Sequence, residues 1–216
     1  MANWWVNRLL IRGPRPCLAA FQKSARGDRP CLYISLPGRP KRQRLSFQRL
    51  QIAASSDRLS TPAFDPADVT VEEPKELKQG MVEVEYGFLM ARYDPEPVLV
   101  EVSRIFPTLC FVLAWVDSNS DTEGSSFIHK GRHHGWKLPK AWKARLQAQI
   151  PTENTGSDDE IDVACWEADS KILTALVEHW NTKSEKVLRI ASRVLLKPMP
   201  GKDKTKARSN SRQRHS

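Results

Sequence analysis

The segment from His129 to Trp136, His-Lys-Gly-Arg-His-His-Gly-Trp, gathers the side chains best suited to chemistry. Two of its histidines lie four residues apart, which on a helix could hold one metal ion. The two glycines disfavour a helix and no companion ligand completes a zinc set, so we predict no metal here. Glycines do let backbone N–H groups approach an anion. The candidate ligand-binding residues are His129, Lys130, Arg132, His133 and His134; the alternative is a turn leading into an edge segment with solvated histidines.

Other catalytic signatures are missing from the sequence. It has no G-x-S-x-G elbow, P-loop or dinucleotide fingerprint, so we expect no cofactor, and enzymatic activity stays an open question. The carboxylates in residues 158–162 fit the N-terminus of a helix, where the helix dipole stabilises negative charge. The cysteines form no C-x-x-C pair, which excludes an iron–sulfur cluster or zinc ribbon. Cys110 lies in an apolar run and Cys165 in a helical pattern, so these two are expected to be buried free thiols. The four cysteines are Cys17, Cys31, Cys110 and Cys165.

Positive charge is concentrated at the two ends of the chain. The net charge is +9 overall, with 34 Lys+Arg against 25 Asp+Glu. Residues 197–216 have too few apolar side chains to fold and are expected to form a disordered basic tail. Basic segments of this kind attract phosphate backbones without reading sequence, so the expected partner is either nucleic acid, bound non-specifically, or an unidentified protein. The alternative is a solubilising tail with no specific partner. The candidate nucleic-acid-binding residues are Arg39, Lys41, Arg42 and Arg44 in a Pro/Gly-rich loop, and Lys202, Lys204, Lys206, Arg208, Arg212 and Arg214 in the tail.

The patterns of apolar residues predict elements that would hold these segments in place. Residues 4–12 and 81–90 alternate as strands, residues 96–105 repeat as a helix ended by Phe106-Pro107, and residues 108–116 form an apolar strand. Further strands are expected at residues 31–36 and 45–52. A short helix is expected at residues 16–24, one helical turn at 66–69 within the long connection 53–80, and a helix at 138–149. A long helix or a helical pair is expected after a capping box at Ser157. No apolar run is long enough to span a membrane, and we expect a cytoplasmic protein.

Several landmarks resemble the YubB-type ferredoxin-like domain family, which is found in bacterial plasmids and phages. They are residues 2–9, 11–14, 86–88, Pro95 and Pro97, Phe106-Pro107 and residues 111–115. The resemblance spans residues 2–139 and implies an α+β fold, a ferredoxin-like βαββαβ sandwich with the long loop 53–80 inserted. A helical extension at 140–196 and the basic tail complete the expected organisation.

This topology makes the first strand and the strand at 81–90 antiparallel neighbours. It would set Arg8 and Arg12 beside Glu83 and Glu85 on one sheet face, with Tyr86 and Phe88 pointing the other way. Such a face lacks the stacking aromatics of an RNA-recognition domain. We therefore expect an accessory or interaction protein that binds nucleic acid weakly through its basic segments. The alternative is a small enzyme or anionic-ligand-binding domain that uses residues 129–134. The oligomeric state stays open, although free edge strands would allow a homodimer.

Overall fold

A computed structural model describes residues 4–27, 45–54, 65–91, 94–117, 122–148 and 158–195 of the chain. Within these residues the fold is α+β, built on a seven-stranded sheet in which every paired neighbour is antiparallel. The order is β2-β4-β1-β5-β6-β7, with β3 also pairing with β4. The strands are β1 (Trp4–Pro14), β2 (Ala67–Val71), β3 (Lys75–Glu76), β4 (Met81–Ala91), β5 (Cys110–Asp117), β6 (Thr122–His129) and β7 (Arg132–Trp136).

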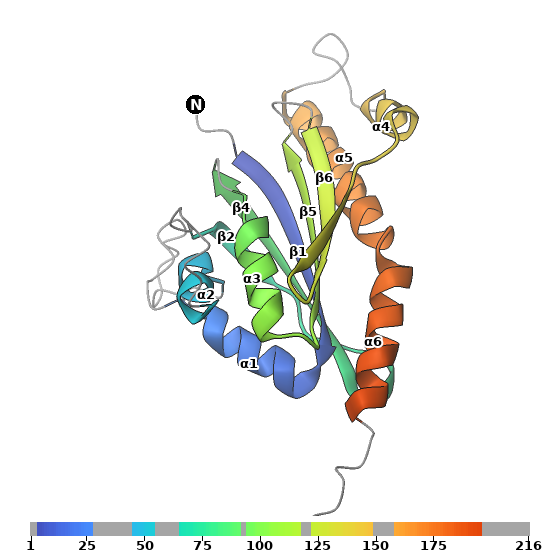
Figure 1. Cartoon of the computed structure of the whole chain (residues 1–216). Coiled ribbons are helices and arrows are strands. Elements are labelled where there is room, and N and C mark those ends of the chain that lie inside the picture. The colour runs from blue at the N-terminus through green and yellow to red at the C-terminus, as the bar shows by residue number, and fades with distance from the viewer. Residues whose placement is uncertain are drawn as a thin grey trace, which may run out of the picture.

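Helices cover both faces of this sheet, as Figure 1 shows: α1, α2 and α3 lie on one side, and α5 and α6 on the other. The six helices of the described chain are α1 (Arg15–Ala25), α2 (Phe47–Ala54), α3 (Glu96–Ile105), α4 (Lys140–Gln147), α5 (Asp158–Glu178) and α6 (Asn181–Leu195), and a 3-10 turn at Lys78–Gly80 precedes β4. In the described part of the chain, no helix has both the length and the apolar character needed to cross a membrane.

Alternation along β1 and β4 divides the apolar side chains between two cores. Leu9 and Ile11 of β1 are fully buried on the side of α1, α2 and α3, whereas Leu10 is buried on the side of α5 and α6. The buried side chains of β4 from Val82 to Met90 all enter the first core. Both strands therefore have the alternation that the sequence predicts, because successive residues of a strand point to opposite faces.

The first core is organised around Phe21 of α1. Its ring makes edge-on contacts with Tyr86, Phe106 and Phe111, at centroid distances of 6.5, 5.9 and 5.6 Å. The predicted inward direction of Tyr86 is confirmed, since this side chain is 1% exposed. Tyr86 of β4 and Phe111 of β5 are thus part of the first core.

The second core forms where α5 and α6 pack on β1, β5 and β6. Leu176 and Trp180 contribute to it beside Val112 and Phe127 of the sheet. Of the two predicted alternatives, one long helix or a helical pair, the structure has the pair. The break falls at His179 and Trp180, ahead of Asn181, where the second helix begins. The expected capping residue Ser157 lies outside the described residues. The face that would carry RNA-stacking aromatics in an RNA-recognition domain is thus covered by helices over much of its area.

Two predicted elements are wrong. Residues 45–52 were expected to form a strand, but residues 47–54 form α2 because Ser46 caps it: its hydroxyl accepts the Arg49 N–H, and Asp65 accepts the Gln48 N–H. The helical turn expected at 66–69 is instead the strand β2, which pairs with the outer edge of β4. The connection 53–80 therefore carries two edge strands. The strand expected at 31–36 lies outside the described residues.

The chain forms two strand–helix–strand units, and in each of them another strand lies between the two parallel strands. β1 leads through α1 to β2, which lies parallel to it with β4 inserted between them. β4 then leads through α3 to β5, with β1 inserted between these two strands. Both connecting helices pack on the same face. The hairpin β6–β7 extends the sheet beyond β5, and α4, α5 and α6 follow it.

Candidate functional site

The predicted histidine segment forms a β-hairpin at one edge of the sheet. β6 ends at His129, Lys130 and Gly131 make the turn with φ angles of 52° and 71°, and β7 is the edge strand. The four residues from Arg132 to Gly135 are exposed. The structure thus has the turn and edge segment that the sequence allowed as the alternative to a binding site.

The hairpin does not bring its five candidate residues together. Arg132 and His134 lie opposite His129 and Phe127 in the register, so they share the sheet face that α5 and α6 cover. His133 lies opposite Ile128 and points to the other face, where its Nε2 is 3.6 Å from the Glu96 carboxylate. The described residues contain no cluster of three His, Cys, Asp or Glu that could hold a metal ion.

Several contacts fix the hairpin on the end of α3. The Gly131 N–H donates to the Ser103 hydroxyl at 2.7 Å, and Arg104 donates to the Gly131 carbonyl at 3.3 Å. The His129 ring lies 3.0 Å from the Pro107 carbonyl. Burial, assisted by the neighbouring charge of Lys130, lowers the pKa of His129. These contacts hold the hairpin against the domain and leave its histidines spread along an edge.

Trp136, at the end of the hairpin, contacts an aromatic side chain at the end of α5. The His179 ring, at the end of α5, stacks on Trp136 of β7 with centroids 3.8 Å apart and planes 3° apart. Lys183 of α6 places its Nζ 5.0 Å from the centre of the Phe127 ring and 5.1 Å from that of Trp180. We use the name β7–α6 surface for two sets of side chains, Arg132, His134 and Trp136 of β7 with His179, on which Trp136 stacks, and Lys183, Lys186 and Arg189 of α6.

The cations of α6 follow one another at helical spacing. Lys183, Lys186 and Arg189 are three residues apart, so each is a neighbour of the next on the helix surface. Lys186 and Arg189 are exposed and Lys183 is partly exposed. Burial lowers the pKa of Lys183, and burial together with the charge of Lys183 lowers the pKa of His179. This row was not predicted from the sequence, because the apolar stripe of the helix was the only pattern considered there.

Arg39, Lys41, Arg42 and Arg44 lie outside the described residues, and so does every candidate residue of the tail from Lys202 onward. What the structure does place is α6, which ends at Leu195, immediately before the tail in the sequence.

A second feature is a groove on the α5 side of the sheet, about 460 Å³ in volume. Its floor is made by β1 and β4, one wall by Ser170 and Thr174 of α5, and the other by Thr70 and Glu72 at the end of β2. We call it the α5–β2 groove. Its existence depends on β2, which the sequence analysis assigned to a loop, and on α5 leaving this part of the sheet uncovered.

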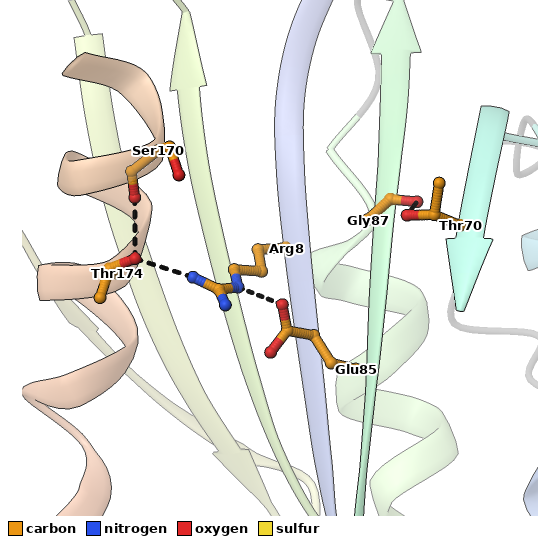
Figure 2. Close-up of polar contacts among 6 residues, drawn as sticks. All are labelled: Arg8, Thr70, Glu85, Gly87, Ser170 and Thr174. Carbon is orange, nitrogen blue, oxygen red and sulfur yellow. Dashed lines mark hydrogen bonds and ion pairs between the residues drawn. The ribbon is translucent and has the colours of Figure 1, made fainter. Parts of the chain in front are cut away.

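The floor of the groove carries an ion pair that the sequence predicts. The Nε of Arg8 donates to the Glu85 carboxylate, and its Nη1 donates to the Thr174 hydroxyl at 2.9 Å. Figure 2 shows Arg8 between Thr174 on α5 and Glu85 on β4. The residue directly opposite Arg8 is Gly87, which has no side chain, so Arg8 pairs diagonally with Glu85. Arg8 thereby joins the helix to the sheet.

A matching ion pair lies further along the same two strands, outside the groove. Arg12 pairs with Glu83 directly across from it, and its Nη2 donates to the Asn181 side chain of α6 at 2.8 Å. The prediction that Arg8 and Arg12 share one face with Glu83 and Glu85 is therefore confirmed. The two pairs are built alike, and of the two it is Arg8 and Glu85 that line the α5–β2 groove.

Comparison of the chain with models of known protein families, with curated proteins and with solved structures finds no match.

Proposed function

We propose that this protein is an accessory binding protein that holds nucleic acid without reading its sequence. The contacts would come from residues 39–44, the tail 197–216 and the β7–α6 surface. The observation that carries the proposal is the row of cations on α6, because this helix leads in the sequence directly into the basic tail. A structured basic row followed by a basic segment would give one continuous track for a phosphate backbone.

For the core of the protein we propose a ferredoxin-like βαββαβ sandwich. The order β2-β4-β1-β5, with α1 and α3 on one face, supports it, because split β-α-β units with a strand inserted between their partners are the plan of that sandwich. The same order is what the resemblance to the YubB-type family implies. We propose membership of that family on this basis, with a bacterial, mobile-element setting and a cytoplasmic location.

Helices cover both faces of the sheet, which supports nucleic-acid binding at the edge of the domain instead of on a sheet face. RNA-recognition domains of this topology stack bases on aromatic side chains of the open face. Here Tyr86 and Phe88 are buried in the first core, and the other face carries ion pairs beneath α5 and α6. Nucleic acid would therefore meet cations at the edge of the domain, where contacts to phosphate fix position but carry no sequence information.

A salt titration tests this proposal. Binding of a labelled generic DNA duplex and an RNA of the same length would be followed by fluorescence anisotropy, using the full chain and a chain lacking residues 197–216. A third protein would carry Lys183→Gln, Lys186→Gln and Arg189→Gln. Its matched control would carry Lys23→Gln, Lys75→Gln and Lys78→Gln, three exposed cations on other elements. Each lost phosphate contact should reduce the slope of log K against log salt by about 0.9 on duplex DNA.

We expect the truncated chain and the α6 triple variant both to bind more weakly and with shallower salt slopes, while the control triple variant retains more affinity. Equal losses in the two triple variants would contradict a role for the β7–α6 surface. Absence of binding by the full chain at low salt would remove the nucleic-acid proposal altogether. A strong preference for one sequence would contradict binding through phosphates alone.

A further inference from the structure

We propose that the α5–β2 groove is a binding site for a small organic cation that carries a primary ammonium group. The lining of the groove has the carboxylates of Glu72 and Glu85 against a single guanidinium, that of Arg8; a third carboxylate, that of Asp169, already has an interaction of its own. This excess of negative charge favours a cation over an anion. The site is distinct from the proposed nucleic-acid surface, because the two share no residue.

The ion pair on the floor keeps hydrogen-bonding capacity for a ligand. Among the described residues, Arg8 uses its Nε and Nη1, and Glu85 accepts from Arg8 with one carboxylate oxygen. The second Glu85 oxygen and the Arg8 Nη2 have no hydrogen-bond partner in that part of the chain. The side chains of Arg8 and Glu85 are 29% and 24% exposed, so they are partly desolvated yet reachable. An ammonium group donates to the kind of oxygen that Glu85 leaves free.

The walls add groups that suit a polar ligand. The Thr174 hydroxyl accepts from Arg8 and donates to the Ser170 carbonyl, which fixes its position. Across the groove the Thr70 hydroxyl faces the Gly87 carbonyl at 3.3 Å, and both residues are drawn in Figure 2. Leu173 supplies an apolar surface for a short carbon chain. A few polar groups set among apolar ones are usual in sites for small molecules, and 460 Å³ is within their usual size range.

Gly87 keeps the groove open. A Cβ at this position would lie 2.7 Å from the Thr70 hydroxyl oxygen, so any larger residue would fill the space between β2 and Arg8. The same absence of a side chain sends Arg8 diagonally to Glu85. The sequence thus places the smallest residue opposite the one cation of the groove.

The test is a titration of the full chain with 1,4-diaminobutane, and with succinate as the anion of similar length. Binding is followed by the backbone amide NMR signals of Thr70, Gly87, Ser170 and Thr174, and by calorimetry. The variants are Glu72→Gln, on the exposed wall, and Glu85→Gln, on the floor. Glu83→Gln is the matched control, because it changes the equivalent carboxylate of the second ion pair, which does not line the groove. Circular dichroism checks that each variant is folded.

We expect the diamine to shift the four groove signals, and succinate to leave them in place. Glu72→Gln and Glu85→Gln should each weaken diamine binding by about tenfold, the usual effect of losing one hydrogen bond to a charged group. Glu83→Gln should bind as the unchanged protein does. Equal affinity in all four proteins, signal shifts spread over residues outside the groove, or tighter binding of succinate would overturn the proposal. If Glu85→Gln does not fold, Glu72→Gln decides the outcome alone.

Discussion

Arg12 and Glu83 form the more buried of the two ion pairs that join β1 to β4. They are register partners, their side chains are only 12% and 14% exposed, and Arg12 also reaches Asn181 at the start of α6. The Arg12 guanidinium therefore links β1 and β4 to α6, whose residue Asn181 is 169 positions away in the sequence.

Glu83→Gln should lower the free energy of unfolding by about 2 kcal/mol, because it leaves the Arg12 charge partly buried without its counter-charge. The matched control is Glu76→Gln. Glu76 pairs with Arg15 at the surface, where the two side chains are 58% and 64% exposed, and such pairs contribute less than about 1 kcal/mol. Urea unfolding followed by circular dichroism measures both. Equal effects of the two substitutions would contradict a structural role for the buried pair.

The stability of the protein should decrease as the pH falls below about 6.5. Burial lowers the pKa of His129 and of His179 in the folded state, with Lys130 and Lys183 adding to the effect. The unfolded chain therefore binds more protons than the folded one once the pH falls below the ordinary histidine pKa, which favours unfolding.

Urea unfolding at about pH 7.5 and about pH 5.5 measures this dependence, compared with the double variant His129→Gln/His179→Gln. The double variant should lose less stability over the same interval. Burial raises the pKa of Asp94, which acts in the opposite direction at acidic pH, so the comparison between the two proteins isolates the histidines. An unchanged pH dependence in the double variant would contradict this assignment.

The central part of the fold could be predicted from the sequence because β1 and β4 alternate strongly. Their alternation also placed Arg8, Arg12, Glu83 and Glu85 on one face, which the structure confirms. Residues 45–54 could not be assigned in this way, since Leu45 and Phe47 fit a strand while Leu50 fits a helix. The choice depends on Ser46 and Asp65, which are 19 positions apart and hydrogen-bonded at 2.7 Å.

Less of the two candidate sites than of the fold could be predicted from the sequence. The floor of the α5–β2 groove follows from strand pairing, but its walls require β2 beside β4 and α5 above the sheet. β2 has only five residues, and it was hidden in a stretch rich in Ser, Pro, Asp and Glu. The stacking of His179 on Trp136 joins β7 to the end of α5. Local patterns contain no signal for such a contact.

The Cys110 thiol should resist alkylation as long as the protein is folded. It is fully buried, and burial raises its pKa to about 12, so almost no thiolate is present near neutral pH. Iodoacetamide labelling followed by peptide mass spectrometry measures this, with Cys17, a half-buried free thiol, as the internal comparison. Cys110 should become labelled only in urea, and after Cys17. Rapid labelling of Cys110 in the native protein would show that α6 opens readily from β5.

Gly131, in the turn of the β6–β7 hairpin, should be hard to replace. Its φ of 71° lies in the left-handed region, and a Cβ there would come within 2.5 Å of the Arg104 side chain that donates to its carbonyl. Gly131→Ala should therefore lower the free energy of unfolding by about 1–2 kcal/mol.

Gly135→Ala is the control in the same hairpin. Its φ is not positive, and the nearest atom to an added Cβ is the Ser125 carbonyl oxygen at 4.0 Å, so the change should be nearly neutral. Thermal unfolding compares the two variants. The Gly131 variant should also lose amide protection at His129 and Arg132 in hydrogen exchange, because the turn that closes this pair is strained. If both alanine variants were equally stable, the hairpin would not depend on the left-handed turn. The stack of Trp136 on His179 would then have to fix the position of Arg132 and His134 on the β7–α6 surface.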